Sequence, residues 1–279
     1  MNQNPSIPLA AVIGHPIAHS KSPALHGYWL RRYRIRGHYI PLDIAPEDLE
    51  ESLRLLPRIG FVGANITIPH KERALEIADI VAERAAAIGA ANTLSFGADG
   101  RIQADNTDGI GFMANLWQSA PDWRPSRGPA CVLGAGGASR AIIFALIEAG
   151  VPEIRLTNRT RARAEELKAA FGPLITIHDW EARDRMLEDS ATLVNTTSLG
   201  MNGKPELEID LTRLPTSALV TDLVYTPLKT ALLHRAEVHG CRIVDGLGML
   251  IHQAAPGFER WFGCAPEVDE AVRQAVLLA

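Results

Sequence analysis

The chain has 279 residues, of which 47% are hydrophobic and 22% are charged, and its formal net charge is −4. This composition is that of a globular protein and excludes a disordered or fibrous chain, while the negative charge argues against a nucleic-acid-binding protein. The three cysteines, Cys131, Cys241 and Cys264, are too far apart to indicate a disulfide framework or a metal cluster, so we expect reduced thiols, no bound metal and a cytoplasmic location.

Apolar runs and turn residues predict alternating strands and helices in the N-terminal half. The expected strands cover residues 9–13, 39–42 and 61–67, and the expected helices cover 22–35, 46–56, 71–79 and 82–88. A Gly-Ala-Asp-Gly turn between residues 93–96 and 101–104 predicts a hairpin. Repeated β-then-α units of this kind favour a mostly parallel sheet with helices on its faces.

A second α/β series follows a loop at residues 119–129, which contains three prolines, two serines and a glycine. The expected strands of this series cover residues 130–133, 154–157, 174–177, 192–195, 219–222 and 242–244, and the expected helices cover 138–148 and 161–171. We therefore predict two α/β domains.

The stretch from residue 130 to 150 is the most apolar window of the chain and invites comparison with a membrane span. Arg140 lies in its middle, where a charged side chain is costly in a bilayer, and four glycines open or close the stretch. We interpret it as a strand, a glycine-rich turn and a helix, and we expect no membrane partner.

The glycine-rich turn, GAGGAS at residues 134–139, is the first indication of a ligand. Gly134 permits a tight turn, and Gly136 lets the backbone approach a pyrophosphate, which the free N–H groups of a helix N-terminus stabilise. The third position of the fingerprint is Ser139 rather than Gly or Ala. Alone, the turn is equally compatible with a plain strand-to-helix connection.

The residues after strand 154–157 favour NADP over NAD. A NAD site usually places Asp or Glu here to bind the ribose 2′-OH, whereas this chain has the neutral Asn158, then Arg159, with Arg161 and Arg163 close behind. A 2′-phosphate requires cationic side chains and no nearby carboxylate. The alternative is a solvated basic helix start, but cations there oppose the helix dipole unless an anion binds.

Polar residues also gather at strand ends in the N-terminal half. Ser20 and Ser22 are spaced to donate two hydrogen bonds to one carboxylate, although Ser22 could instead only cap a helix. Lys71 starts an expected helix, and Asp108 follows the strand at 101–104. Open α/β sheets bind ligands at strand C-termini, so this Lys and Asp form a candidate acid/base pair for alcohol oxidation. Their spacing does not establish that they meet.

Together these segments resemble the shikimate/quinate dehydrogenase family over nearly the whole chain. The matching segments, in family order, are SKSPALH at 20–26, NITIPHK at 65–71, ANT at 91–93, NTDG at 106–109, GAGGASR at 134–140, NRT at 158–160, NTTSLGM at 195–201, DLVYTPLKT at 222–230 and DGLGMLIHQA at 245–254. The chain departs from the family at Gly27, where Asn is usual.

The resemblance implies two α/β domains, a substrate-binding and catalytic domain formed by residues 1–112 with 247–279, and a Rossmann-like NADP-binding domain at 113–246. It implies the reversible NADPH-dependent reduction of 3-dehydroshikimate to shikimate in aromatic amino acid biosynthesis, with NADP as cofactor. A homodimer is compatible with it, and no nucleic acid is expected.

The resemblance also implies site residues. Lys71 and Asp108 would be the catalytic pair, with Lys71 as proton shuttle. The substrate would contact Ser20, Ser22, Asn65, Thr67, Asn92, Asp108, Tyr225 and Gln253. The cofactor would contact Glu83, Gly134, Ala135, Gly136, Gly137, Ala138, Asn158, Arg159, Thr160, Arg161, Ala162, Arg163, Leu223, Gly246 and Met249. Glu83 is also compatible with an ordinary exposed helix position.

Two alternatives remain at this point. The nearer one is a dual-specificity quinate/shikimate dehydrogenase that could use NAD, against which the paired serines and the Asn158–Thr160 segment argue. The other is a non-catalytic nucleotide-sensing homologue, which predicts the loss of Lys71 or Asp108, yet both are present.

Overall fold

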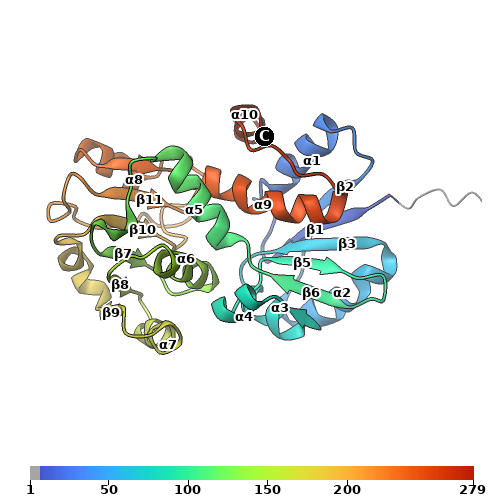
Figure 1. The fold of residues 1–279 in the computed structure, drawn as a ribbon, viewed down its shortest axis with the longest axis horizontal. Coiled ribbons are helices and arrows are strands. Elements are labelled where there is room, and N and C mark those ends of the chain that lie inside the picture. The colour runs from blue at the N-terminus through green and yellow to red at the C-terminus, as the bar shows by residue number, and fades with distance from the viewer. Residues whose placement is uncertain (1–6) are drawn as a thin grey trace, which may run out of the picture. The chain divides into compact units, whose positions relative to one another are not determined.

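The chain folds into two compact units, each with its own six-stranded sheet (Figure 1). The computed structural model describes residues 7–279. One unit comprises Met1–Gly111 with Leu250–Ala279, and the other comprises Phe112–Met249. The chain crosses between them inside two helices, α5 (Asp108–Ser119) and α9 (Leu247–Phe262). The predicted organisation in two α/β domains is confirmed.

The first unit has a mixed sheet. Its strands are β1 (Leu9–Gly14), β2 (His38–Asp43), β3 (Phe61–Ile66), β4 (Ile80–Val81), β5 (Thr93–Phe96) and β6 (Ile102–Asp105), in the order β2-β1-β3-β5-β6-β4. Strand β1 pairs in parallel with β2 and β3, whereas β5 is antiparallel to both β3 and β6. The predicted hairpin is therefore present as β5 and β6.

Helices cover both faces of this sheet. They are α1 (Ser22–Arg32), α2 (Leu49–Leu55), α3 (Lys71–Ile77), α4 (Glu83–Ile88), the last turns of α9 and α10 (Glu270–Leu277). Ala11 and Ile13 of β1 face an aliphatic core with Leu53 of α2 and Ile77 of α3. On the other face, α1 and α9 contribute an aromatic cluster, and Figure 1 shows these two helices on the side opposite to α2 and α3.

Three predicted helices of this unit end differently from expectation, and the one expected at 71–79 ends at Ile77, because Ala78 is extended. The helix expected at 22–35 ends at Arg32, because Arg34 adopts a left-handed φ of 55° and the Ile35 N–H donates to the Leu30 carbonyl. This 6→1 bond is typical of a Schellman-type helix end. The helix expected at 46–56 is a short α-helix, α2, between two 3₁₀ turns at Pro46–Asp48 and Leu56–Ile59.

The second unit has an entirely parallel sheet. Its strands are β7 (Ala130–Leu133), β8 (Ile154–Thr157), β9 (Ile175–His178), β10 (Thr192–Asn195), β11 (Leu219–Asp222) and β12 (Arg242–Val244), in the order β12-β11-β10-β7-β8-β9. This is the order of the doubly wound dinucleotide-binding fold, in which the connections reverse between β7 and β10. Its helices include α6 (Gly137–Glu148), α7 (Arg161–Phe171), α8 (Ala231–Val238) and the 3₁₀ segment Trp180–Leu187.

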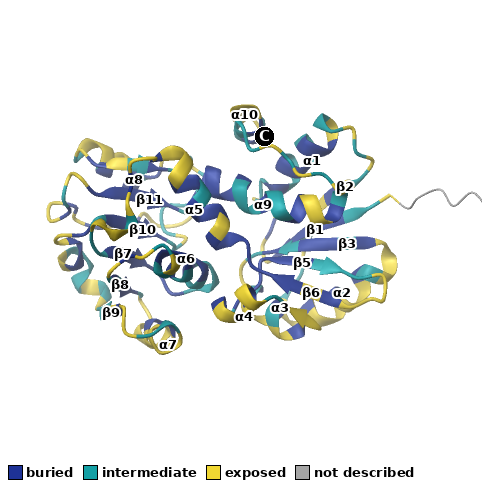
Figure 2. Cartoon of the chain, viewed as in Figure 1, coloured by how far each residue is buried: buried dark blue, intermediate teal, exposed yellow. Residues whose placement is uncertain are grey.

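The central strand β7 is buried on both sides, as a parallel sheet covered by helices requires. Val132 packs in one core with Leu116 of α5 and Ile142 of α6. Cys131, its neighbour, faces the opposite core with Leu232 of α8. Figure 2 shows β7 and the strands β10 and β11 beside it as buried.

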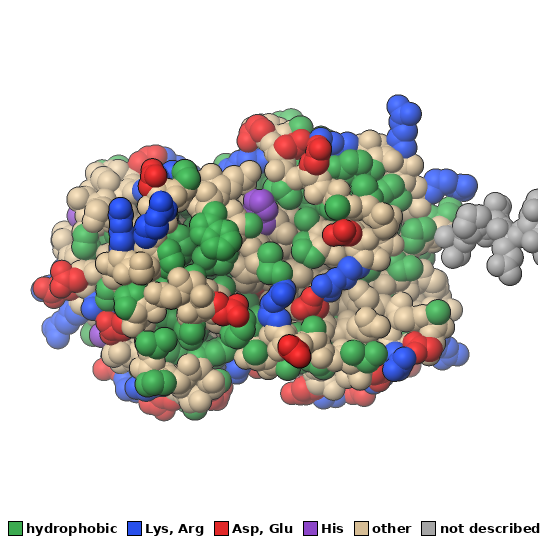
Figure 3. All heavy atoms as spheres, in the orientation of Figure 1, with side chains coloured by type: hydrophobic (Ala, Val, Ile, Leu, Met, Phe, Trp, Pro, Cys, Tyr) green, Lys and Arg blue, Asp and Glu red, His purple; other side chains and the backbone are tan. Residues whose placement is uncertain are grey.

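Among the described residues there is neither a membrane-spanning helix nor a cluster of metal ligands. Between residues 7 and 279, no helix combines the length and apolarity needed to cross a bilayer. The same residues contain no group of three or more His, Cys, Asp or Glu side chains placed to hold a metal ion. On the face drawn in Figure 3, basic and acidic side chains are interspersed rather than gathered by sign.

Candidate active site

The candidate acid/base pair meets in the first unit. Lys71 is the first residue of α3, after β3, and Asp108 is the first residue of α5, after β6. The Lys71 Nζ donates to Asp108 Oδ2 over 2.5 Å, and the side chains are 11% and 1% exposed. The structure thus brings together two residues that are 37 positions apart, after the ends of β3 and β6, which flank β5 in the sheet.

Asp108 is held on all sides by hydrogen bonds. The Asn92 Nδ2 donates to Asp108 Oδ1 over 2.8 Å, and the Asp108 N–H donates to Asn106 Oδ1 over 3.0 Å. Both carboxylate oxygens therefore have partners, and the backbone of Asp108 is fixed as well. A carboxylate held in this way orients the Lys71 ammonium without needing to move.

A buried polar cluster connects this pair to α9. The Asn92 Nδ2 also donates to Thr107 Oγ1 over 3.0 Å, and Thr107 Oγ1 donates to the Gln253 carbonyl over 2.8 Å. The side-chain Oε1 of Gln253 is buried and has no hydrogen-bond partner among residues 7–279. Since buried polar atoms are nearly always partnered, this oxygen points to a ligand donor.

Asn65 and Thr67 lie at the end of β3 and in the loop after it. The Asn65 Nδ2 donates to the Asn92 carbonyl over 3.3 Å, so Asn65 belongs to the same polar region as the candidate pair. Thr67 packs against Gly14, where a Cβ would lie 2.6 Å from Thr67 Cγ2. Glycine at the end of β1 is therefore required for Thr67 to occupy this position.

Ser20 and Ser22 lie at the start of α1. The N-cap residue of this helix is Lys21, and no side chain makes a capping hydrogen bond. Instead, the Ser22 N–H donates to Ser20 Oγ over 3.3 Å. The alternative that Ser22 acts as the capping residue is therefore wrong, and its hydroxyl is not used to cap the helix.

The glycine-rich turn follows β7 in the second unit. Gly134 has a φ of 108°, and a Cβ there would lie 2.7 Å from Thr196 Oγ1, so only glycine fits. A Cβ at Gly136 would meet nothing within 4 Å, which leaves open space above the N-terminus of α6. Ser139 is fully buried, accepts from the Gly136 N–H and contacts Thr196 Oγ1 over 2.6 Å, so its hydroxyl is accommodated at the third fingerprint position.

The arginines after β8 differ in what they contact. Arg161 donates to Glu165 Oε1 over 2.9 Å and to Asp179 Oδ1 over 2.5 Å. Arg159 and Arg163 are exposed, and within the described part of the chain their side chains have no ion pair or hydrogen bond. Two cations are therefore available to an anion, whereas Arg161 is already engaged.

Other predicted cofactor residues of the second unit lie at the same turns, whereas Glu83 belongs to the first unit. Asn158 Oδ1 accepts from the Ala135 N–H over 3.2 Å, which ties the β8 loop to the glycine-rich turn. Gly137 and Ala138 begin α6, Thr160 precedes α7, and Ala162 lies in its first turn. Glu83 is exposed in the first turn of α4, in the first unit.

Leu223 and Gly246 lie against each other. A Cβ at Gly246 would be 2.5 Å from the Leu223 carbonyl oxygen, so the loops after β11 and β12 approach as closely as glycine allows. Met249 is 7% exposed in the first turn of α9. Tyr225 is half-buried in the loop after β11.

Asp222, at the end of β11, was not among the predicted site residues. Its carboxylate accepts from Asn195 Nδ2 and the Val224 N–H over 2.9 Å each, and from Thr230 Oγ1 over 2.7 Å. It thus joins the loops that follow β10 and β11. Burial raises the pKa of Asp222 to about 6, while its three hydrogen bonds oppose the shift. The sequence placed Asp222 in a family segment but gave no sign of its burial.

Asp222→Asn should change how stability depends on pH. Because the folded-state pKa lies above the unfolded value of 3.8, Asp222 stabilises the fold fully below that value, and this contribution is lost as the pH rises through about 6. Between pH 3 and pH 8, the free energy of unfolding of the parent should fall by about 3 kcal/mol relative to the variant. Urea unfolding at several pH values measures this difference.

Asp210→Asn is the matched control. Asp210 is exposed, and hydrogen bonds from Thr212 lower its pKa, so any difference should have the opposite sign. Parallel stability curves for the parent and Asp222→Asn would contradict the role assigned to burial.

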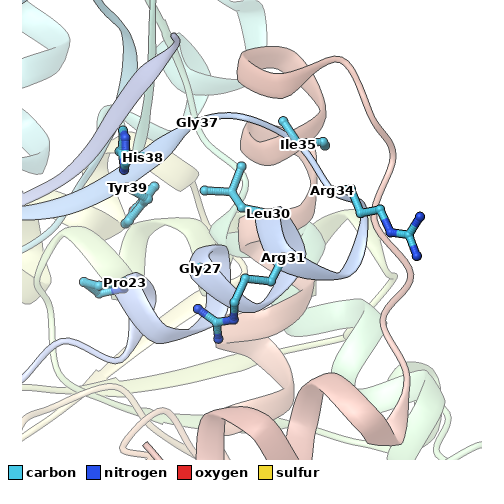
Figure 4. Close-up of a pocket in the computed structure, with 9 residues that line it drawn as sticks. All are labelled: Pro23, Gly27, Leu30, Arg31, Arg34, Ile35, Gly37, His38 and Tyr39. Carbon is cyan, nitrogen blue, oxygen red and sulfur yellow. The ribbon is translucent and has the colours of Figure 1, made fainter.

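None of the predicted site residues lines the cavity drawn in Figure 4. It has a volume of about 550 Å³ and lies between α1 and β2, where Arg31, Arg34 and Tyr39 are among its lining residues. The guanidinium groups of Arg31 and Arg34 point in different directions, so the lining does not converge on one point.

Comparison with known proteins identifies similar chains along the whole length. Residues 12–94 match the shikimate dehydrogenase substrate binding domain, residues 123–200 match shikimate/quinate 5-dehydrogenase, and residues 246–277 match the shikimate 5′-dehydrogenase C-terminal domain. The chain is 65% identical over 277 residues to a shikimate dehydrogenase (NADP(+)) of Cereibacter sphaeroides, covering 99% of each chain. It is 62% identical over 270 residues to one of Paracoccus denitrificans, covering 97% and 96%.

Two solved structures are also similar to this chain over nearly its whole length. Shikimate 5-dehydrogenase of Thermus thermophilus, in complex with NADP(H) and shikimate, is 37% identical with a TM-score of 0.86, covering 98% of this chain and 99% of that chain. Quinate dehydrogenase of Corynebacterium glutamicum, in complex with NAD, is 30% identical with a TM-score of 0.89 and the same coverage.

Proposed function

Because the chain belongs to the shikimate/quinate dehydrogenase family, we propose that it reduces 3-dehydroshikimate reversibly to shikimate with NADPH, in aromatic amino acid biosynthesis. The observation that carries this proposal is the buried ion pair of Lys71 and Asp108, which supplies a positioned proton donor and acceptor. Identity of 65% to an NADP-dependent shikimate dehydrogenase supports the substrate and the cofactor.

The ion pair explains how the chain handles the proton. In the reductive direction, the Lys71 ammonium donates a proton to the oxygen that becomes the 3-hydroxyl, and in the oxidative direction the Lys71 amine accepts it. Asp108 orients the Lys71 side chain through the hydrogen bond between them. The cofactor, when bound, supplies or accepts the hydride at the carbon that bears this oxygen.

The chain has hydrogen-bonding groups that suit a polyhydroxylated ring acid. We assign the substrate carboxylate to Ser20 and Ser22, at the N-terminus of α1, where the helix dipole favours an anion. The ring hydroxyls are assigned to Asn65, Thr67, Asn92 and Gln253, and Tyr225 to closing the substrate pocket. The unpartnered Oε1 of Gln253 supports its part in this assignment.

Residues of the second unit are suited to NADP. The open space at Gly136 leaves room for a pyrophosphate at the start of α6, and the unengaged Arg159 and Arg163 suit a 2′-phosphate. The proposed cofactor contacts are Glu83, Gly134, Ala135, Gly136, Gly137, Ala138, Asn158, Arg159, Thr160, Arg161, Ala162, Arg163, Leu223, Gly246 and Met249. Residues 113–246 are then the cofactor domain, and 1–112 with 247–279 the substrate domain.

Initial rates at 340 nm with shikimate or quinate, each paired with NADP or NAD, test the proposal. We expect strong preference for shikimate with NADP, because paired serines and unengaged arginines suit these two ligands. Comparable rates with quinate or NAD would indicate a dual-specificity enzyme. Absence of activity in all four pairings would favour a non-catalytic homologue.

Two further parts of the proposal concern the protein in the cell. We propose a homodimer, which size-exclusion chromatography with light scattering tests directly. We propose a cytoplasmic location because the cysteines are widely spaced and, in the structure, free.

A further inference from the structure

We propose that Tyr39 is a positioning residue for the substrate, because its hydroxyl fixes the Asn65 amide so that Asn65 Oδ1 faces a ring hydroxyl as an acceptor. This inference rests on the proposed function, in which Asn65 binds shikimate. Tyr39 lies outside the short motifs that the sequence analysis identified, and its sequence signal there is a place in an expected strand.

The register of the sheet places the two side chains on one face. Tyr39 of β2 is paired with Ala10 of β1, and Asn65 of β3 is paired with Val12 of β1. Since Ala10 and Val12 are two positions apart, all four side chains leave the same face of the sheet. The Tyr39 hydroxyl reaches across β1 and donates to Asn65 Oδ1 over 2.7 Å.

The orientation of the Asn65 amide follows from its other neighbours. The Asn92 carbonyl lies 3.3 Å from the Asn65 Nδ2, and a carbonyl can only accept, so the amide nitrogen must face it. Thr93 Oγ1, at 3.4 Å, takes the second N–H. Both Asn65 donors are then used, so Oδ1 is the side-chain atom of Asn65 that can accept from a hydroxyl of the substrate.

The Tyr39 ring is held in place by its surroundings. It is 7% exposed and stacks on the fully buried ring of His26, with centroids 3.8 Å apart and an interplanar angle of 4°. Burial lowers the pKa of His26 to about 3, so the stacked imidazole is neutral. The ring of Trp261 in α9 belongs to the same cluster, with its centroid 6.2 Å from that of Tyr39. The Tyr39 ring supports the fold, and the hydroxyl alone is assigned to positioning.

Tyr39→Phe separates these two roles. The ring, its stacking and its contribution to the wall of the cavity in Figure 4 are kept, and the hydrogen bond to Asn65 is removed. We expect the KM for shikimate to rise about 3- to 10-fold, the effect of losing one hydrogen bond. We expect kcat to change less than about twofold, and the KM for NADP to stay the same, because the hydroxyl contacts neither the reacting atoms nor the cofactor.

Tyr33→Phe is the matched control. The Tyr33 hydroxyl accepts from the Glu267 N–H over 2.8 Å, in the same unit but away from Asn65, so its loss should leave both KM values unchanged. Thermal unfolding of both variants shows how much stability each hydroxyl contributes. A general loss of stability would lower activity without raising the KM for shikimate selectively.

A double-mutant cycle with Asn65→Ala decides whether Tyr39 acts through Asn65. If it does, Tyr39→Phe should have no further effect on the KM for shikimate once Asn65 is alanine. An unchanged KM in Tyr39→Phe, or an equal rise in both backgrounds, would overturn the inference. Absence of shikimate oxidation by the parent enzyme would instead overturn the proposed function, which separates the two failures.

Discussion

Lys71→Ala should lower kcat for shikimate oxidation by about 100-fold or more, the usual scale for loss of a general acid–base group. The reason is the pairing seen in the structure, in which Asp108 holds the Lys71 ammonium at 2.5 Å and Asn92 holds Asp108. No other lysine lies in this buried cluster among the described residues. Initial rates at saturating shikimate and NADP measure the effect.

Stability has to be followed in the same variant. Removal of Lys71 leaves the buried Asp108 carboxylate without its counter-charge, which destabilises a fold. Circular dichroism and NADP binding therefore accompany the kinetics, and Asp108→Asn in the Lys71→Ala background removes the unpaired charge. Lys168→Ala, on the exposed surface of α7, should leave kcat unchanged. Near-normal turnover by a folded Lys71→Ala enzyme would reject the catalytic role.

Arg159→Gln should raise the KM for NADP by about 10-fold or more, because a charge-assisted hydrogen bond to a phosphate contributes about 1.5–3 kcal/mol. The KM for NAD should change little, since NAD has no 2′-phosphate. Arg159 is exposed and has no ion pair or hydrogen bond among residues 7–279, so it breaks no existing interaction when it binds an anion.

Arg161→Gln provides the matched comparison, at the first residue of α7. Because Arg161 already contacts Glu165 and Asp179, we expect a smaller rise in the KM for NADP than in Arg159→Gln. Equal effects of Arg159→Gln on NADP and NAD would reject the 2′-phosphate role. An Arg161→Gln effect as large as that of Arg159→Gln would show that Arg161 leaves its acidic partners to bind the cofactor.

The strands of the second unit could be predicted closely from the sequence. Residues 130–133, 154–157, 192–195, 219–222 and 242–244 are strands with the expected bounds. The first four of these segments are largely buried, so their short apolar runs mark them. The last, β12, begins with the exposed Arg242. In contrast, β4 has two residues, both exposed, and leaves no periodic pattern.

The sequence identified the residues of the candidate pair, but it did not show which side chains contact one another. The sequence identified Lys71 and Asp108, but their meeting depends on how the segments after β3 and β6 are placed by pairing through β5. The Tyr39 hydrogen bond likewise depends on the order β2-β1-β3, which no local pattern encodes. The ion pair of Arg161 with Asp179 likewise joins residues 18 positions apart, so no local pattern predicts it.

The discontinuous first unit has a consequence during synthesis. All six strands of its sheet precede residue 106, but one face is covered by α9, whose Trp261 donates to the Leu94 carbonyl over 3.0 Å. A nascent chain therefore carries His26, Trp29 and Tyr39 without their cover while about 150 further residues are translated, which takes on the order of ten seconds. The intervening Phe112–Met249 is contiguous and can fold within that interval. During that interval the N-terminal sheet exposes apolar surface of the kind that makes folding intermediates prone to aggregate.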